Sequence, residues 1–332
     1  MAELCRPSFS VLSWNVFVGA PSHSIDLARF EAQAALLKRE AADVYCLQEV
    51  FSEPVVRLFE RELGEDYEVL RGRPSLGRAA LRLGLQVVAA LFAAVGIAAL
   101  VVRRKGWPAT AEAFLAGVGA LWLARRVNSS VLWSFALGPT PGGLLMLCRR
   151  ETVKVESHRY CDFATQGGDW LNLFRCRGYT CARLIVHGMA TKIVNAHTNA
   201  FPTLGMLDAE PAPSPERASQ LEEAFSESRG LLILEKEGFI VMGDFNTNPD
   251  DHEMPAEKYG LSNCWAHGNC STHDTPCVTL PLTDTLAFVF PDTRRDLCSD
   301  YQFYKGLSVV RADVLKIGSL SDHLPLRAVY QF

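Results

Sequence analysis

The stretch IVMGDFNTNPD, residues 240–250, is an apolar run that stops at a glycine and then presents Asp244, Asn246 and Asn248 in quick succession. A short apolar run closed by turn-forming residues is typical of a buried strand. In an α/β sheet, catalytic and binding groups gather beyond the strand ends, where loops bring side chains from several strands together. An ordinary turn is the alternative, because Asp and Asn side chains readily cap their own backbone.

Apolar strands alternate with amphipathic helices along the rest of the chain. The hydrophobic periodicity predicts strands at 9–17, 43–50, 142–150, 180–188, 191–200, 298–306 and 321–332, and helices at 24–41, 53–63 and 214–238. This alternation predicts a layered α/β domain in which two packed sheets carry outer helices.

Bulk composition limits the function classes. The chain has 332 residues, of which 48% are hydrophobic, so it can form a substantial core. Its formal net charge of −4 gives no general attraction to nucleic acid. The N-terminus lacks the apolar region of a secretory signal, so a cytosolic start is expected. Sequons at Asn128 and Asn269 leave a non-cytosolic face open.

The ten cysteines form no CxxC pair. The densest group is Cys264, Cys270 and Cys277, interleaved with His267 and His273. Because these spacings fit no common zinc pattern, a loop with free thiols or one local disulfide is favoured over a metal site.

Polar residues recur where predicted strands end, and this recurrence points to a site. They are Asn15, Glu49, His197, Asn199, Asp244, Asn246, Asp300, Asp322 and His323. A hard cation such as Mg²⁺ takes oxygen ligands and commonly only one or two protein carboxylates, which Glu49 with Asn15 would supply.

A histidine is a good base near neutral pH when a carboxylate fixes its tautomer, and His323 with Asp300 would form such a pair. Amides and a second histidine can donate hydrogen bonds to a phosphoryl oxygen as its charge builds up. Asn246 and His197 are suited to that role.

Six motifs in order resemble the endonuclease/exonuclease/phosphatase superfamily of metal-dependent phosphoesterases. They are SWNV at 13–16, LQEV at 47–50, NAHTNA at 195–200, GDFNTNP at 243–249, SDYQFY at 299–304 and SDHLPL at 321–326. The resemblance implies a four-layer α/β sandwich of two packed mixed sheets flanked by helices. It also implies in-line attack of water on a phosphate ester, with Mg²⁺ as cofactor and Mn²⁺ as a substitute. Asp244 would orient the nucleophile, and Asp322 would lie beside the histidine or a second metal.

One segment sets this chain apart from soluble nucleases. Residues 83–102, LGLQVVAALFAAVGIAALVV, are long enough to cross a bilayer, and a second apolar run follows at 109–124. Because family motifs flank them, these runs interrupt one catalytic domain, which we assign to 1–332 with a membrane-associating insert at 76–140. The chain must return to the same side of the bilayer, so the insert forms a hydrophobic helical hairpin or lies in one leaflet. A buried helical pair packed on the domain is the alternative.

Within the superfamily, the chain looks most like the neutral sphingomyelinases. The segment GGDWLNLFRCRGYTCARL, 167–184, resembles their Asp-Trp followed by a basic residue and glycine, although that subfamily has a lysine where this chain has arginines. The resemblance implies substrate-binding roles for Asp169, Arg177 and Asn199.

We therefore expect a Mg²⁺-dependent phosphodiesterase that hydrolyses a membrane lipid. The first candidate is sphingomyelin, whose products would be ceramide and phosphocholine. A phosphoinositide or other lipid phosphatase and a DNase-like nuclease are the alternatives. The expected partner is the lipid bilayer and not nucleic acid, and the expected location is a membrane with the catalytic domain on its cytosolic side.

Overall fold

Two mixed β-sheets face one another in the computed structural model, which describes residues 7–16, 27–72, 141–165, 177–199, 214–229, 237–246, 255–264, 299–317, 320–321 and 323–332. The described strands of sheet A are, in spatial order, β11 (Ser308–Val314), β12 (Leu326–Gln331), β1 (Ser8–Asn15), β2 (Val44–Gln48), β4 (Leu145–Arg149) and β3 (Tyr67–Arg71). Those of sheet B are β5 (Val153–Asp162), β6 (Gly178–Val186), β7 (Met189–His197), β8 (Gly238–Asp244), β10 (Asp300–Lys305) and β9 (Ser262–Asn263).

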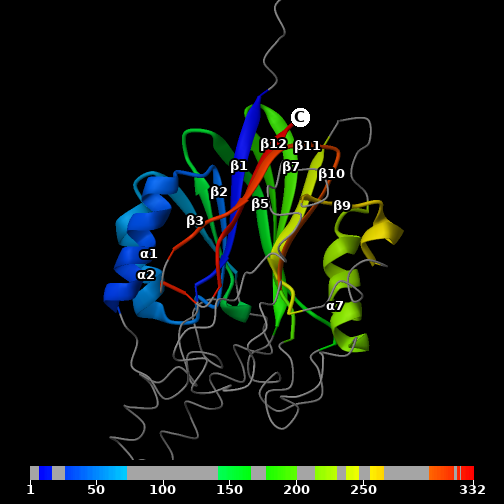
Figure 1. The fold of residues 1–332 in the computed structure, drawn as a ribbon, viewed down its shortest axis with the longest axis horizontal. Helices are drawn as coiled ribbons and strands as arrows, with labels where there is room; N and C mark the ends of the chain where they lie inside the picture. The colour runs from blue at the N-terminus through cyan, green and yellow to red at the C-terminus, as the bar shows by residue number, and fades with distance from the viewer. Residues whose placement is uncertain are drawn as a thin grey trace, which may run out of the picture.

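Helices cover the outer face of each sheet (Figure 1). The helices α1 (Leu27–Glu40) and α2 (Glu53–Leu63) pack on sheet A, and α7 (Pro215–Ser226) packs on sheet B. A third apolar cluster fills the space between the sheets. The predicted α/β fold of two mixed sheets with outer helices is therefore confirmed for the described residues.

Helix α2 shows why the sequence forms these elements. Val55, Val56, Phe59 and Leu63 are buried at helical spacing, so one face of the helix packs on the sheet. A proline lies in the first turn, where its missing N–H costs no hydrogen bond. The observed bounds equal the predicted range of 53–63.

Each sheet has one parallel pair among its described strands, and this pairing creates the site. The pairs are β1–β2 and β7–β8, and the other described pairings are antiparallel. Parallel strands end at the same sheet edge, so Asn15 lies opposite Gln48, and His197 lies opposite Asp244. The antiparallel strand β10 begins at Asp300, opposite Asp244.

Gly243 allows β8 to approach β7 at this edge. Its φ of 143° lies in the region that favours glycine. A Cβ at this position would lie 1.8 Å from the carbonyl oxygen of Ala196 on the neighbouring strand. Only glycine therefore permits the pairing that puts His197 and Asp244 side by side.

A buried amide pair holds the two sheets in register just behind this edge. Gln48 Nε2 on sheet A donates to Asn195 Oδ1 on sheet B at 2.8 Å. Asn195 Nδ2 donates in return to the Leu47 carbonyl oxygen at 3.1 Å. Because both side chains are buried, these bonds strongly favour one arrangement of the sheets.

The structure differs from the sequence prediction in two ways. The helix predicted at 214–238 ends at Ser226, and Gly238 already begins β8. The strands β3, β5, β9 and β11 were not predicted. All four are edge strands, whose partly exposed residues give a weak apolar signal.

The predicted apolar insert at 76–140 lies outside the described residues. Among the described residues, no helix is long and apolar enough to cross a membrane. The strands on either side of the insert are described, and they pair with each other, with Arg71 opposite Leu145. The two described residues that flank the insert therefore lie near one another, at the Arg71–Leu145 end of the β3–β4 pair.

We predict that replacing residues 78–139 by a short Gly/Ser loop preserves the fold. The flanking strands already pair, and each halving of loop length changes the closure free energy by only about 0.6 kcal/mol. Circular dichroism and thermal unfolding of the loop variant should show one cooperative transition close to that of the parent protein in detergent. An unfolded loop variant would instead mean that the two apolar runs are core helices.

Candidate active site

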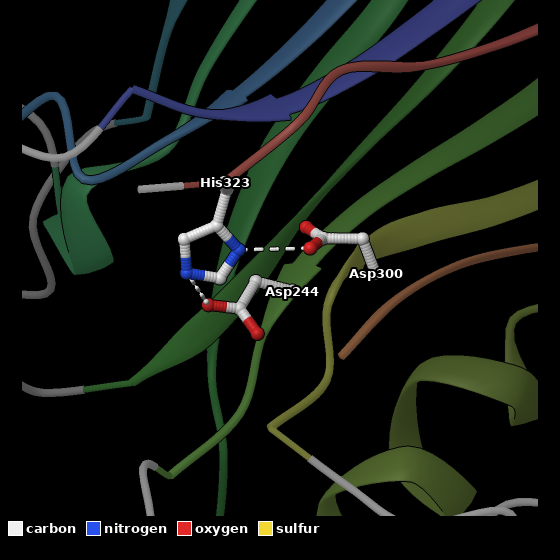
Figure 2. Close-up of side chains that lie close together, drawn as sticks. All are labelled: Asp244, Asp300 and His323. Carbon is white, nitrogen blue, oxygen red and sulfur yellow. Dashed lines mark hydrogen bonds and ion pairs between the residues drawn. The ribbon is translucent and has the colours of Figure 1, made fainter. Parts of the chain in front are cut away.

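The carboxylate of Asp244 is the centre of the candidate site. It lies at the end of β8 and is almost completely buried. Asn15 Nδ2 donates to its Oδ2 at 2.9 Å, and His197 Nε2 lies 3.3 Å from the same oxygen. The Asn246 backbone N–H donates to Oδ1 at 3.0 Å. His323 Nε2 lies 3.7 Å from Oδ2 (Figure 2). Five residues predicted from the sequence are thus brought together.

These neighbours keep Asp244 ionised. Burial by itself would raise the pKa of Asp244. The facing His323 and His197, together with the Asn15 hydrogen bond, outweigh burial and hold the pKa well below its usual range. The site therefore carries a fixed negative charge at neutral pH.

His323 is held by a second carboxylate, as predicted. Its Nδ1 lies 2.8 Å from Asp300 Oδ2, and Figure 2 shows the ring between the two aspartates. Because a carboxylate accepts, Nδ1 carries the proton in the neutral ring and Nε2 is the nitrogen that can take up another. Asp300, His323 and Asp244 offer ligand atoms within 4.8 Å of one another and could also hold an ion. The short contact of His323 Nδ1 with Asp300 and the preference of Mg²⁺ for oxygen ligands favour a general-base role for the His323–Asp300 pair over ion binding.

The other site histidine, His197, is also buried, and its charged form is disfavoured. Burial lowers the pKa of His197, and the adjacent Arg177 lowers it further. Asp244 and Glu49 act in the opposite direction. Arg177 is itself buried, and its Nη1 contacts Nδ1 of His197. Neutral His197 is therefore suited to donate from one nitrogen, as the sequence analysis expects.

Glu49 and Asn15 form a donor set that fits a hard divalent cation. Glu49 directly follows Gln48, the register partner of Asn15, so the two residues leave adjacent strands at one edge. Asn15 uses Nδ2 on Asp244, so Oδ1 is the atom through which it could bind a cation. Glu49 has a φ of 61°, unusual for a residue other than glycine, and such backbone strain clusters at functional sites. A carboxylate with an amide oxygen is the ligand chemistry of Mg²⁺.

Asn246, already placed beside Asp244, and one further predicted residue, Asn199, lie in loops next to this centre. Asn246 has a φ of 44°, and its Nδ2 donates to the Thr198 carbonyl oxygen at 3.4 Å. Asn199 is buried, and its backbone N–H donates to Gln220 Oε1 on α7 at 2.9 Å. Asn199 Oδ1 has no hydrogen-bond partner within the described part of the chain.

Two predicted residues, Asp322 and Asp169, lie outside the described residues. Four members of the cysteine–histidine segment do as well: His267, Cys270, His273 and Cys277. Cys264 is described and packs in the core between the sheets.

Two residues to which the sequence motifs gave no role, Ser321 and Trp14, hold His323 in place. Ser321 Oγ donates to the Asn15 carbonyl oxygen at 2.7 Å and accepts from the His323 backbone N–H at 3.2 Å. Trp14 Nε1 donates to the His323 carbonyl oxygen at 2.9 Å. Trp14 belongs to the SWNV motif and Ser321 to the SDHLPL motif. In SDHLPL, a serine two positions before a histidine is a signal for a local side-chain turn.

The sequence matches the model of the endonuclease/exonuclease/phosphatase family over residues 12–323. No curated protein is similar enough in sequence to count as a match. The fold is similar to that of truncated TDP2 of Caenorhabditis elegans, at 14% identity over 98% of each chain and a TM-score of 0.59. It is also similar to the human nocturnin catalytic domain, at 15% identity over 98% of this chain and 94% of that one, with a TM-score of 0.57. An endonuclease/exonuclease/phosphatase protein of Bacteroides vulgatus gives 14% identity, 98% and 100% coverage and a TM-score of 0.57. At these identities the likeness establishes the fold.

We predict that Asn15→Asp destabilises the protein in a pH-dependent way when chelator is present. It replaces a donor to Asp244 by a second buried carboxylate, which should cost about 3–5 kcal/mol at neutral pH. One of the two carboxyl groups would then have a folded-state pKa above its unfolded value. The folded variant would bind an extra proton, and its stability should recover as the pH falls.

Asn15→Ala is the matched control, because it removes the donor without adding charge. Urea unfolding at pH 5 and pH 8 should show a gap between the two variants that is large at pH 8 and small at pH 5. Equal stabilities at pH 8 would contradict the Asn15–Asp244 contact.

Proposed function

This chain belongs to the endonuclease/exonuclease/phosphatase family, and we propose that it is a Mg²⁺-dependent phosphodiesterase acting on a membrane lipid, sphingomyelin first. Members of this family are metal-dependent hydrolases of phosphodiester bonds. The observation that carries the proposal is the buried triad in which His323 lies between Asp300 and ionised Asp244. The reaction would be hydrolysis of sphingomyelin to ceramide and phosphocholine.

His323 is the proposed general base. Asp300 fixes Nδ1–H, so Nε2 takes a proton from the attacking water, and Asp300 stabilises the imidazolium that forms. Asp244 accepts a hydrogen bond from the same water and orients it. The water oxygen forms a bond to phosphorus as the bond to the ceramide oxygen breaks on the opposite side. The ceramide oxygen takes up a proton from solvent, and His323 then returns its proton to solvent.

Asn246 and His197 are the proposed donors to the phosphoryl oxygens. Charge grows on these oxygens in the transition state, and fixed donors in a buried site stabilise it without reorganising. His197 is the last residue of β7, and Asn246 lies in the loop after β8, where it is anchored to the Thr198 carbonyl oxygen.

Glu49 and Asn15 are the residues that would hold the metal, with Asp322 as a further ligand or a neighbour of the base. When bound, Mg²⁺ or its substitute Mn²⁺ would neutralise charge on the phosphate ester. Arg177, Asn199 and Asp169 remain predicted substrate-binding residues.

The place where the insert joins the fold supports a lipid substrate. Leu145, at the return point, lies opposite Leu47 on β2, two residues before Glu49. The Val50 N–H also donates to the Gly143 carbonyl oxygen at 2.8 Å. The insert is therefore attached at the sheet edge that carries the candidate site. If the apolar runs at 83–102 and 109–124 bind a bilayer, the site is held near lipid headgroups, with the catalytic domain on the cytosolic side.

We predict that His323→Ala and Asp300→Ala each lower the turnover of a chromogenic phosphodiester by about 10²–10⁴-fold. Since the two residues act as one unit, the double variant should be little slower than the worse single variant. His158→Ala, on the edge strand β5, is the control and should keep full activity. Strictly multiplicative losses would show that the two side chains act independently.

We predict that a substrate panel identifies a lipid diester. Sphingomyelin, phosphatidylcholine, phosphoinositides and DNA would be compared with Mg²⁺, with Mn²⁺ and with chelator. Sphingomyelin should be hydrolysed fastest, and chelator should abolish the activity. Glu49→Gln should lose at least about 100-fold, since even residues behind a metal ligand contribute 10–100-fold. Glu53→Gln, four residues along on the exposed side of α2, should be unaffected.

The variant in which a Gly/Ser loop replaces residues 78–139 distinguishes the choice of substrate from attachment to the membrane. It should hydrolyse sphingomyelin in detergent micelles and lose activity on intact vesicles. Preferred cleavage of DNA would refute the lipid substrate. Full activity in chelator would refute the metal dependence. Release of the parent protein from membranes by salt alone would refute the proposal that the apolar runs at 83–102 and 109–124 are embedded in the bilayer.

A further inference from the structure

Arg177 is a buried cation placed directly behind a site histidine. It immediately precedes β6, whose first residue, Gly178, lies opposite His197. Its side chain is almost completely buried, and Nη1 contacts His197 Nδ1. On its other edge the ring presents Nε2 to Asp244 Oδ2 at 3.3 Å. Arg177, His197 and Asp244 thus form a row that crosses β6, β7 and β8.

The donor chemistry of this row allows only one neutral tautomer of His197. A guanidinium has N–H groups and no acceptor atom, and it stays protonated in proteins. The nitrogen that it contacts must therefore be the acceptor, so Nδ1 carries no hydrogen. The ring hydrogen then lies on Nε2, which faces the carboxylate of Asp244.

The second histidine of the site has the opposite arrangement. His323 Nδ1 meets an acceptor, Asp300, so its hydrogen lies on Nδ1 and its Nε2 can accept. An arginine behind one ring and a carboxylate behind the other give the two rings opposite tautomers at the same centre. One Nε2 becomes a donor and the other becomes an acceptor.

We propose that Arg177 is a positioning residue that holds His197 in its Nε2–H tautomer, so that the ring can only donate at this centre, to Asp244 in the free protein and to the phosphoryl oxygen once an ester is bound, and cannot act as a second base. This inference rests on the proposed function for the identity of the acceptor in the reaction. The tautomer itself rests only on the geometry.

The backbone around Arg177 is built to keep the guanidinium in place. The Phe163 N–H donates to the Arg177 carbonyl oxygen at 3.2 Å. A Cβ on Gly178 would lie 2.3 Å from the Cys161 carbonyl oxygen and 2.4 Å from the Tyr160 hydroxyl. The close contact of β5 with β6 therefore fixes the chain next to Arg177. Burial and the arginine charge also lower the pKa of His197, which agrees with a neutral ring.

The sequence analysis gives Arg177 a different role, direct binding of substrate. The two roles predict different results when the histidine is changed. A substrate-binding arginine acts whether or not a ring lies beside it. A positioning arginine has nothing to position once the ring is replaced by a side chain without tautomers.

The first test reads the tautomer without any substrate. Long-range proton–nitrogen spectra of the full chain, labelled at histidine nitrogen, distinguish the Nδ1–H and Nε2–H forms, and His197→Gln identifies the signals of this ring. The parent protein should show only the Nε2–H form. Arg177→Met, which keeps the aliphatic bulk, should allow a hydrogen on Nδ1, either as the imidazolium beside Asp244 or as the Nδ1–H form, and Arg177→Lys should largely restore the neutral Nε2–H form.

Arg183→Met is the matched control, because Arg183 lies on β6, the strand that Arg177 precedes, and pairs with Glu237 and Glu156 at a partly exposed position. Its His197 signals should equal those of the parent. A His197 ring that stays Nε2–H in Arg177→Met, or that is Nδ1–H in the parent, would overturn the proposal.

The second test is a double-mutant cycle in turnover. Arg177→Met should lower kcat by about 10- to 1,000-fold, the upper limit being the loss of one transition-state donor, with little change in KM. Gln at position 197 can donate without a tautomer, so Arg177→Met should cost less than about threefold in the His197→Gln background. An equal loss in both backgrounds, or an effect on KM alone, would assign Arg177 to the substrate and refute positioning.

The proposed function and the positioning role of Arg177 can be refuted independently. If no phosphodiester is hydrolysed by the parent protein, the proposed function fails while the spectra still decide the tautomer. If the parent is active and the spectra show no dependence on Arg177, the positioning role alone is refuted.

Discussion

A carboxylate removed from water needs donors around it, and Asp244 takes its donors from both sheets. Asn15 reaches it from sheet A, while His197 and the Asn246 backbone reach it from sheet B. The same charge therefore stabilises the contact between the two halves of the fold and orders the groups that would act on a phosphate ester. Behind it, the Gln48–Asn195 amide pair ties the sheets a second time. The accuracy of the site depends on the register of one sheet against the other.

The arrangement gives similar side chains different chemical roles. His197 and His323 are both buried, and both face Asp244, yet one has a guanidinium behind it and the other a carboxylate. The partner behind each ring, more than the ring itself, decides which nitrogen carries the hydrogen. Asp244 stays ionised between them because its neighbours outweigh the effect of burial on its pKa. The environment thus separates acceptor from donor within a few ångströms.

How far the sequence predicts this structure depends on burial and on sequence distance. The central strands were predicted because most of their residues are buried, and in VYCLQ of β2 and GFIVMGD of β8 every residue is. The edge strands were missed, because strands such as β5 and β11 contain many exposed polar residues. The strand-end position of Asn15 and Asp244 could be predicted from local pattern. Their hydrogen bond spans 229 positions of sequence, and no local pattern encodes such a pairing. The contact of Arg177 with His197 was missed for the same reason, since it follows from the β6–β7 register.

Gly243 has a consequence for how this chain can change over time. A single methyl group there would collide with the Ala196 carbonyl oxygen and push β8 away from β7. The carboxylate of Asp244 and the ring of His197 would then lose their common position in one step. A residue that takes no part in the chemistry is therefore as intolerant of substitution as the residues that do. Mutational drift at this position would separate Asp244 from His197 before it altered either side chain.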